Sequence, residues 1–411
     1  MIGSNWRTVP LGTLFTHRNE PVRSGNVAAL SVTKNGVVDQ LDSVSTSVDG
    51  TPKKLVHQGD IVINSRSDRK GSAGLSPRMG SVSVINTTLK PRDIHPRFAH
   101  HLLRSTWFQE EFYRFGSGIV ADLWSTRWSA MKSIRLRAPD SHTQIEIASY
   151  LDRETSQIDE LAFDLQSALS LRTERLQSTI EHAFLSSHKY QIPLKRLGIS
   201  ITAGVSVNAS TYAAEEGHPG VLKTGAASRG YFDPTENKAV EDSNEVARLS
   251  TPALKGTIIV NRANTPDLVG SAALVDRHVD DLYLSDLLWQ VRVERADPAY
   301  VAAYMQTRAY RDSIDLIRVG SSASMQKISQ ENFANIPVPA LPLAQQAAIA
   351  DEVSRARQEF RDAEDDINLA ITLAKERRAA LITAAVTGQI DVTAKRRPAA
   401  EQLEDDIKEL S

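Results

Sequence analysis

Two long stretches of the chain carry apolar residues at helical spacing and contain no proline or glycine. In residues 143–185 the spacings are four, seven and eleven, and the positions are Ile147, Leu151, Ile158, Leu165, Leu169, Leu176 and Ile180. Residues 343–387 repeat the pattern before Gly388, with Ile349, Val353, Phe360, Ile367, Ala374 and Leu381. Such periodicity predicts one amphipathic helix in each stretch. At ~1.5 Å per residue, a helix of about 43 residues is ~65 Å long.

A helix of this length presents an apolar stripe that needs a partner. Helices in globular proteins average about 11–12 residues, so one ordinary domain covers only part of such a stripe. The two stripes resemble each other, and pairing the helices would cover both. We therefore expect an antiparallel coiled coil. The alternative is that each helix packs separately on its own domain.

The regions around the helices read as mixed α/β domains. Short β-branched runs bounded by Gly, Pro, Asn and Asp predict strands, as in the stretches KLVHQGDIVIN, SVSVIN, GTIIVN and LLWQVRVE. Each region also carries one amphipathic helix pattern, near 97–114 in the first region and near 299–312 in the second. The predicted fold class is therefore α+β.

The chain also repeats itself. An ungapped shift of 202 places residues 134–185 on 336–387 with 13 identities in 52 positions. The shift is 197 between GDIVINSR (59–66) and GTIIVNRA (256–263), and 183 between VPLGTL (9–14) and IPLKRL (192–197). A repeat that is constant at its ends and variable in its middle suggests two equal scaffolds that carry different surfaces.

This pattern divides the chain into five segments with pseudo-two-fold organisation. They are a first mixed domain, 1–142; a central long helix, 143–187; a second mixed domain, 188–341; a C-terminal long helix, 342–389; and a charged tail, 390–411. The tail has a high density of charged residues, and we expect it to be mobile at least in part.

Charge is unevenly distributed along the 411 residues. Residues 1–142 hold 19 Lys/Arg and 11 Asp/Glu, a balance of +8, whereas 143–187 carry −5, 188–341 carry −1 and 342–411 carry −4. The first domain is therefore suited to a polyanion, although a dedicated nucleic-acid binder is usually more basic. The chain contains no cysteine, and we expect neither a secretory leader nor a membrane span. A cytoplasmic location fits these features.

Familiar catalytic motifs are missing from the sequence. There is no phosphate-binding glycine loop, no Gly-x-Ser-x-Gly and no His-Glu-x-x-His. His100 and His101 lack a carboxylate at metal-ligand spacing, and we interpret them as packing or surface residues. Catalysis by this chain alone is not expected.

The motifs together resemble a known family. The Gly-Asp-Ile-Val-Ile strand, the stretch IPVPALPLAQQAAIADEV (336–353) and the ending AALITAAVTGQIDV (379–392) resemble the DNA specificity (S) subunit, HsdS, of type I restriction–modification systems. The resemblance extends over nearly the whole chain. The first copy of the entry motif, IRLRAPDSHTQIEIASYL (134–151), is degraded. The family's usual Glu-Gln pair is reduced to Gln144 and Gln346.

This resemblance implies a non-catalytic DNA-binding protein. Two target-recognition domains would each read one half of a split, asymmetric sequence in double-stranded DNA. The helices would set the gap between the halves and dock two methyltransferase (M) subunits, with Gln144, Ile147, Gln346 and Ile349 as docking residues. The chain itself would bind no cofactor. S-adenosylmethionine would belong to the M subunits, and ATP with Mg to the restriction (R) subunits.

Candidate DNA-binding residues of the first domain lie in two loops. Exposed Arg, Lys, Asn and Ser suit base edges and phosphates. The loop 64–72 and the loop 116–129 are rich in them, and Lys53 and Lys54 are candidates for phosphate contacts. The loop residues chosen are Asn64, Arg66, Ser67, Arg69, Lys70, Trp124 and Arg127. The alternatives are a solvated turn for the first loop and core anchoring for the tryptophan.

The second domain offers counterparts at the repeat shifts. Stretches 260–271 and 320–332 are the counterparts of the loops 64–72 and 116–129, and 223–233 is expected near the same group of strands. They supply Lys223, Arg229, Arg262, Asn264, Ser322, Gln326 and Lys327. No target sequence follows from these residues.

Two rival interpretations remain. A duplicated coiled-coil scaffold that binds only proteins predicts no DNA footprint even when M subunits are present. A lone enzyme predicts a catalytic cluster, which the sequence does not offer. The +8 balance of the first domain argues mildly against the scaffold.

Overall fold

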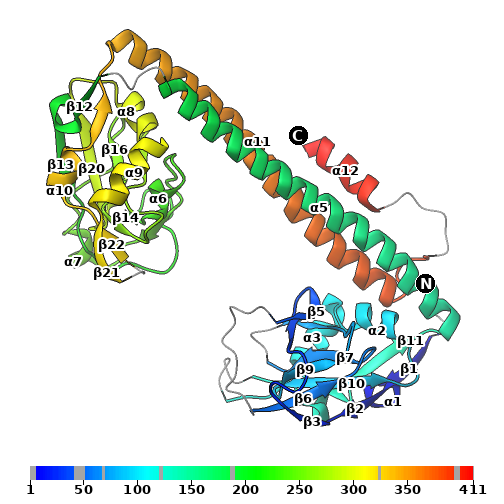
Figure 1. Cartoon of the computed structure of the whole chain (residues 1–411). Helices are drawn as coiled ribbons and strands as arrows, with labels where there is room; N and C mark the ends of the chain where they lie inside the picture. The colour runs from blue at the N-terminus through cyan, green and yellow to red at the C-terminus, as the bar shows by residue number, and fades with distance from the viewer. Residues whose placement is uncertain are drawn as a thin grey trace. The chain divides into compact units, whose positions relative to one another are not determined.

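The computed structural model describes residues 6–40, 51–66, 70–119, 124–185, 190–322, 325–392 and 399–410. The chain forms two compact units, which we call unit 1 (Met1–Ser167 with Asp366–Ser411) and unit 2 (Ala168–Asp365). Each unit contains one α/β domain and about half of each long helix, α5 (Ser141–Phe184) and α11 (Leu343–Val386) (Figure 1).

The domain of unit 1 is built on a four-stranded antiparallel sheet. Its order is β2 (Phe15–Arg18), β10 (Asn86–Pro91), β7 (Ile61–Asn64) and β8 (Ala73–Leu75). A second sheet contains β3 (Pro21–Arg23), β6 (Pro52–Val56) and β9 (Gly80–Ser83). Two further strand pairs are β1 (Arg7–Pro10) with β11 (Arg135–Ala138), and β4 (Leu30–Thr33) with β5 (Gly36–Asp39). The helices are α1 (Leu11–Leu14), α2 (Pro96–Leu102), α3 (Thr106–Arg114) and α4 (Trp128–Met131).

Unit 2 has a main sheet of the same strand order. It contains β13 (Ile199–Ala203), β20 (Leu288–Val293), β16 (Ile258–Asn261) and β18 (Ala272–Leu274). The other strands are β15 (Asn237–Ala239), β14 (Gly220–Leu222) and β19 (Leu282–Leu284); β17 (Ala263–Asn264), β22 (Met325–Lys327) and β21 (Val319–Ser322); and β12 (Gln191–Pro193) with β23 (Pro337–Pro339). The helices are η5 (Leu194–Leu197), α6 (Gly225–Ser228), α7 (Ser243–Val246), α8 (Pro298–Tyr304), α9 (Arg308–Ile317) and α10 (Gln330–Ala334).

Repeat-equivalent residues pair in the same register in both units. In unit 1 Val9 faces Leu136; adding 183 and 202 gives Ile192 and Val338, which face each other in unit 2. The same holds in the main sheets, where Ile61 faces Leu89 in unit 1. Adding 197 and 202 gives the pair Ile258 and Val291 of unit 2. The sequence shifts therefore correspond to one scaffold used twice.

The central strands are apolar because both of their faces are covered. Along β7, Ile61 and Ile63 face the core that contains Phe98 and Phe108 of α2 and α3, while Val62 lies in a separate cluster under the second sheet. Side chains alternate between faces along a strand. A continuous run of apolar residues therefore suits this position better than an alternating one.

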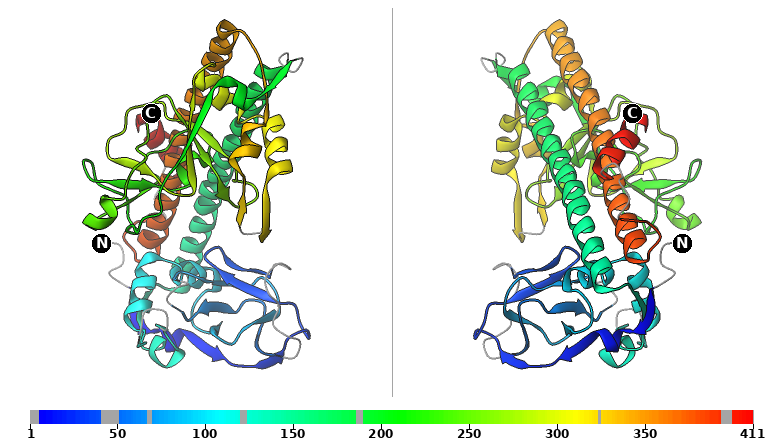
Figure 2. Two further views of the ribbon diagram at one scale, coloured as in Figure 1. Left: turned by 90° about the vertical axis from the view of Figure 1, so that its left-hand side faces the viewer. Right: turned by 90° about the vertical axis from the view of Figure 1, so that its right-hand side faces the viewer.

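Each unit brings the beginning of one long helix beside the end of the other. In unit 1 Ile158 of α5 and Ala374 of α11 share a buried cluster, and Arg378 pairs with Asp159 at 2.8 Å. In unit 2 the core contains Ile180 of α5 together with Val353 of α11. The helix segments are antiparallel within each unit (Figure 2).

The part of the tail that the structure describes contains a helix. Helix α12 (Ala399–Leu410) belongs to unit 1 and lies beside the end of α11 in both views of Figure 2. Leu403 is 2% exposed and packs with Ile158 and Ala374, and Arg377 donates a hydrogen bond to Gln402. Leu403 and Ile407 are four residues apart, so they share one helix face.

Candidate nucleic-acid interface

The two candidate loops of the first domain meet in the structure. Arg66 and Ser125 form an antiparallel bridge, and the backbone N–H of Thr126 donates to the carbonyl of Ser65 at 2.9 Å. The loop after β7 is thereby tied to the loop before α4. Residues that are about 60 positions apart in the chain contribute to one surface, which a hydrogen-bonded backbone holds in place.

These loops border a concave surface, which we call the unit 1 groove. It is lined by His17, Asn19, Lys54, Ser65, Arg66, Val84, Ile85, Thr87, Ser125, Arg127, Trp128 and Ser129. Arg66 and Arg127 are exposed, and neither has an ion-pair partner among the residues that the structure describes. An unpaired guanidinium on a concave surface is suited to a phosphate or to the edge of guanine.

The floor of the groove is more constrained. The ammonium group of Lys54 donates to the carbonyl of Asn86 at 2.7 Å, and burial lowers the pKa of Lys54. His17 stacks on Trp128 with ring centroids 5.4 Å apart. Burial, and secondarily the charge of Lys54, lower the pKa of His17. A neutral imidazole presents one donor and one acceptor, so His17 can bond to either kind of group.

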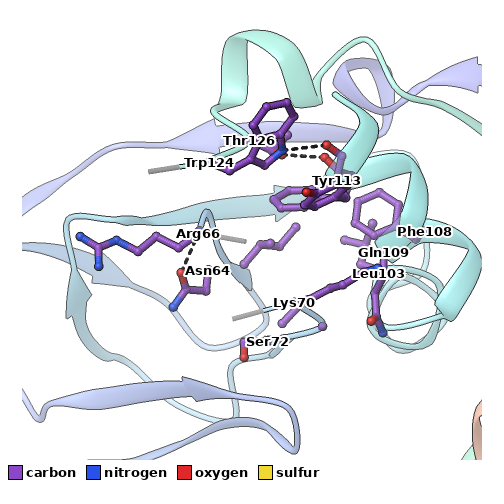
Figure 3. A pocket seen from close by; sticks show the side chains of 14 residues that line it. Asn64, Arg66, Lys70, Ser72, Leu103, Phe108, Gln109, Tyr113, Trp124 and Thr126 are labelled. Carbon is purple, nitrogen blue, oxygen red and sulfur yellow. Dashed lines mark hydrogen bonds between the residues drawn. The ribbon is translucent and has the colours of Figure 1, made fainter. Parts of the chain in front are cut away.

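Two of the predicted contacts are engaged within the domain (Figure 3). Lys70 pairs with Glu110 at 2.6 Å, and its ammonium group lies 5.5 Å from the ring centroid of Tyr113. The indole N–H of Trp124 donates to the carbonyl of Tyr113 at 3.0 Å, and the two rings stack. The anchoring interpretation of Trp124 fits these contacts better than base reading does.

Three other predicted residues of the first domain are not among the residues that line the groove. Lys53 precedes Lys54 on β6 and therefore points to the opposite face of that strand. Ser67 and Arg69 lie outside the described residues. Of the predicted residues that the structure describes, Lys54, Arg66 and Arg127 line the groove.

Unit 2 pairs its candidate stretches in the equivalent way. Ala263 faces Lys327, and Asn264 faces Gln326, between β17 and β22. Adding 197 to Arg66 gives 263, and adding 202 to Ser125 gives 327, so the bridge of unit 1 recurs at equivalent positions. Lys327 is exposed, whereas Asn264 is half-buried. Ser322 ends β21. At this pairing unit 2 therefore has amide groups and the ammonium group of Lys327, where unit 1 has the guanidinium group of Arg66.

Three other predicted cations of unit 2 bond to neighbouring groups. Lys223 pairs with Glu236 at 2.8 Å, and Arg229 donates to the hydroxyl of Tyr231 at 2.9 Å. Arg262 donates to the carbonyl of Asp286. As the structure places them, these three side chains support the domain.

The predicted docking glutamines are buried and hydrogen-bonded within the chain. Gln144 is 2% exposed; it accepts from the N–H of His95 at 2.7 Å and donates to the carbonyl of Pro139 at 2.9 Å. Gln346 is 4% exposed and makes the equivalent bonds to Asp297 and Leu341, at 2.9 and 2.8 Å. Both amides fasten a long helix to its own domain, so their side chains are not available to a partner.

The two neighbouring hydrophobic residues are also directed inward. Ile147 is 2% exposed and lies in the core of unit 1, and Ile349 packs against the core of unit 2. Identity between the two copies therefore reflects a shared packing requirement at the start of each helix.

The paired histidines also join a domain to a helix. His101 contacts Asp152 of α5 at 2.6 Å, and the N–H of Leu75 donates to Nδ1 of His100 at 3.1 Å. Within the described ranges, no group of three His, Asp or Glu side chains is arranged to hold a metal ion. Over the same ranges, no helix is both long and apolar enough to cross a bilayer.

Sequence reasoning missed the groove residues that lie outside the candidate stretches, among them His17, Asn19, Val84 and Ile85. One signal was present: Val84 and Ile85 form a turn, where glycine and polar residues are usual. His17 and Asn19 lie far along the chain from the candidate loops, and only the pairing of β2 with β10 brings that region to the groove.

Comparisons with known proteins were informative at the level of structure. No protein-family profile matches the chain, and no curated protein matches it. A chain of a solved type I restriction–modification system, described for its assembly and conformational transition, is 15% identical with a TM-score of 0.59, over 95% of this chain and all of that one. This chain therefore has the fold of that component of a type I restriction–modification system. The resemblance predicted from sequence is thus confirmed for the fold.

Two further solved structures are described as specificity subunits. The HsdS subunit from Thermoanaerobacter tengcongensis is 13% identical, with a TM-score of 0.47 over 94% of this chain and 98% of that one. The S subunit from M. genitalium is 15% identical, with a TM-score of 0.39 over 93% and 96%. Identities this low concern the specificity-subunit fold and not its target.

Proposed function

We propose that this chain is the DNA specificity subunit of a type I restriction–modification complex. Residues 1–142 and 188–341 are the two target-recognition domains, and each reads one half of a split, asymmetric sequence in double-stranded DNA. The chain catalyses nothing itself. It acts in the cytoplasm with two M subunits that hold S-adenosylmethionine, and with R subunits that use ATP and Mg.

One observation carries the proposal: the same strand pairing presents different side chains in the two units. Arg66 pairs with Ser125 in unit 1, and Ala263 pairs with Lys327 in unit 2. Equal scaffolds with unequal exposed residues are what a protein needs to read two different sequences. A scaffold that binds only proteins has no comparable need for this variation.

The long helices are the second part of the proposal. In each unit the segments of α5 and α11 run antiparallel, and we propose that they continue as one antiparallel coiled coil that separates the domains. A rigid helix fixes a distance far better than a flexible linker does. Two half-sites are read together only when their spacing and helical phase match the protein.

The reading surfaces can be tested by mapping methylation in cells that express the chain with its M subunit. Arg66→Ala and Arg127→Ala should each relax one position of one half-site, with a loss of discrimination of about 1–3 kcal/mol, or about 5- to 150-fold. Lys327→Ala should affect the other half-site only. Lys90→Ala is the matched control, because Lys90 is exposed in the same domain as the arginines and outside the groove.

An equal loss at both half-sites would assign Arg66 and Arg127 to phosphates or to the fold. No footprint on DNA in the presence of M subunits would favour the protein-only scaffold.

The spacing can be tested separately. Inserting four residues near Ser167 adds about one turn to α5. The gap between the half-sites should change while both half-sites keep their sequence, as read by long-read methylation mapping. An unchanged gap contradicts the role of the helices as spacers.

A further inference from the structure

The turn between β9 and β10 breaks a local rule of sequence. Val84 and Ile85 form the turn, and they are 51% and 39% exposed. Turns favour Gly, Asn, Asp, Pro and Ser, whereas β-branched residues suit strands. The core is already supplied by the flanking residues Val82 and Leu89, which are 1% and 0% exposed. Two adjacent apolar side chains are therefore exposed without a packing role.

The turn is held firmly in this exposed position. The side-chain amide of Asn86 donates to the carbonyl of Ser83 at 3.2 Å, which closes the turn. Lys54 donates to the carbonyl of Asn86 at 2.7 Å and ties the turn to β6. The apolar side chains are thus presented on a fixed backbone, and little conformational freedom is lost when they contact a partner.

The surroundings identify the kind of partner. Val84 and Ile85 line the same groove as Arg66 and Arg127. A hydrophobic protein surface would leave two unpaired guanidinium groups at its edge. The major groove of DNA offers both complements: guanine N7 and O6 accept from arginine, and the thymine C5-methyl is the apolar group.

We propose that Val84 and Ile85 recognise thymine C5-methyl groups in the half-site read by unit 1. The inference rests on the proposed function and adds a base to it: this half-site combines thymine with a guanine contacted by Arg66 or Arg127. Unit 2 differs at this point, because adding 202 gives Asp286 and Leu287. A carboxylate accepts from the cytosine amino group and has no affinity for a methyl group.

Deoxyuridine tests the proposal because it lacks the C5-methyl and pairs as thymine does. Binding of the complex with its M subunit is measured on duplexes in which each thymine of the mapped target is replaced in turn. At one or more positions of the unit 1 half-site, affinity should fall about fourfold, the loss expected for one buried methyl. When a thymine of the other half-site is replaced, any loss of affinity should be the same whether or not the turn carries Val84 and Ile85.

The variant Val84→Ala with Ile85→Ala should bind the thymine duplex more weakly and be insensitive to deoxyuridine. Val84→Thr is the conservative control, because threonine keeps the shape of valine. This variant should retain most of the sensitivity to deoxyuridine that Ile85 contributes. The turn is exposed, and circular dichroism with thermal melting checks that the variants fold.

Three results overturn the inference: a unit 1 half-site without thymine, a wild-type complex that is insensitive to deoxyuridine, or equal sensitivity in the double variant. Equal sensitivity would mean that another residue contacts the methyl group. A complex that binds no specific target at all would instead refute the proposed function.

Discussion

Unit 1 and unit 2 place different chemistry on matching strands. At the two paired positions unit 1 has Arg66 and Ser125, and unit 2 has Ala263 and Lys327. The buried pairs behind them, such as Ile61 with Leu89 and Ile258 with Val291, are apolar in both. Register is set by buried side chains, because a slip of one residue would expose them. The exposed positions are therefore free to differ without altering the scaffold.

The two domains also differ in charge, by +8 for residues 1–142 against −1 for 188–341. Contacts to phosphate dominate affinity for DNA. Under the proposed function, the first domain would therefore supply more of the non-specific attraction to DNA, and the second would depend more on partners or on directional hydrogen bonds. Three experiments test how far the two units are equivalent beneath these differences.

The largest effect is expected where an aromatic residue has a smaller counterpart. Phe184 is 1% exposed in the core of unit 2, and its ring centroid is 5.4 Å from that of Tyr300. The equivalent residue of unit 1 is Val386, since 184 plus 202 is 386. Phe184→Ala should destabilise unit 2 by about 3–5 kcal/mol through loss of burial and a cavity. Hydrogen exchange should show lost protection in β16 and unchanged protection in β7.

Phe163→Ala is the control, because Phe163 lies on the same helix and is 71% exposed. Equal loss of protection in both main sheets would mean that the units do not unfold separately.

The buried glutamines should give equal effects in the two units. Gln144→Ala leaves the N–H of His95 and the carbonyl of Pro139 without partners, and Gln346→Ala does the same at Asp297 and Leu341. Each should cost about 1–3 kcal/mol in its own unit, since buried polar groups lose their hydrogen bonds. Thermal melting with hydrogen exchange measures both.

Gln345→Ala is the matched control for the glutamine variants, because Gln345 is the exposed neighbour on α11. It should change the stability by no more than about 0.5 kcal/mol. If Gln346→Ala proves equally mild, the amide does not hold the helix to the domain.

Acid should weaken unit 1 more than unit 2. Burial, with the nearby Arg104 charge, lowers the pKa of His100 to about 3, while an unfolded histidine has a pKa near 6.5. Below pH 6.5 the unfolded chain binds a proton that folded His100 does not bind. Stability therefore falls with falling pH, by up to about 1.4 kcal/mol at pH 5.5 relative to pH 7.5.

The equivalent residue of unit 2 is Ala302, since 100 plus 202 is 302. His100→Ala should abolish the contribution of this residue to the pH slope of unit 1, as measured by hydrogen exchange of β8 at the two pH values. A slope that persists unchanged would assign the effect to other groups, such as Asp152.

Much of the scaffold was predictable because it is written in local patterns. The helices were predicted at 143–185 and 343–387 and are found at Ser141–Phe184 and Leu343–Val386. The paired end strands follow from the repeat. Parts of β6 and β9 were predicted as strands from the runs KLVHQGDIVIN and SVSVIN. Strand β3 and the pairing of the three strands were not predictable, because short strands carry little periodicity and tertiary packing chooses their neighbours.

The site was harder to predict than the scaffold. Arg66 and Lys70 looked alike in sequence, yet only Arg66 is free of an ion pair among the described residues, because α3 brings Glu110 to Lys70. Gln144 and Gln346 looked like surface docking residues, because identity between copies does not separate burial from binding. Whether a polar side chain is free to bind a ligand depends on residues far away in the sequence that the fold brings next to it.

Helix α12 makes unit 1 different from unit 2. It covers Ile158 and Ala374, and no described segment of unit 2 has an equivalent position in the repeat. Under the proposed function, two copies of one partner would therefore meet different surfaces. The helix segments of unit 1 are covered by an acidic helix, and among the described residues those of unit 2 have no such cover.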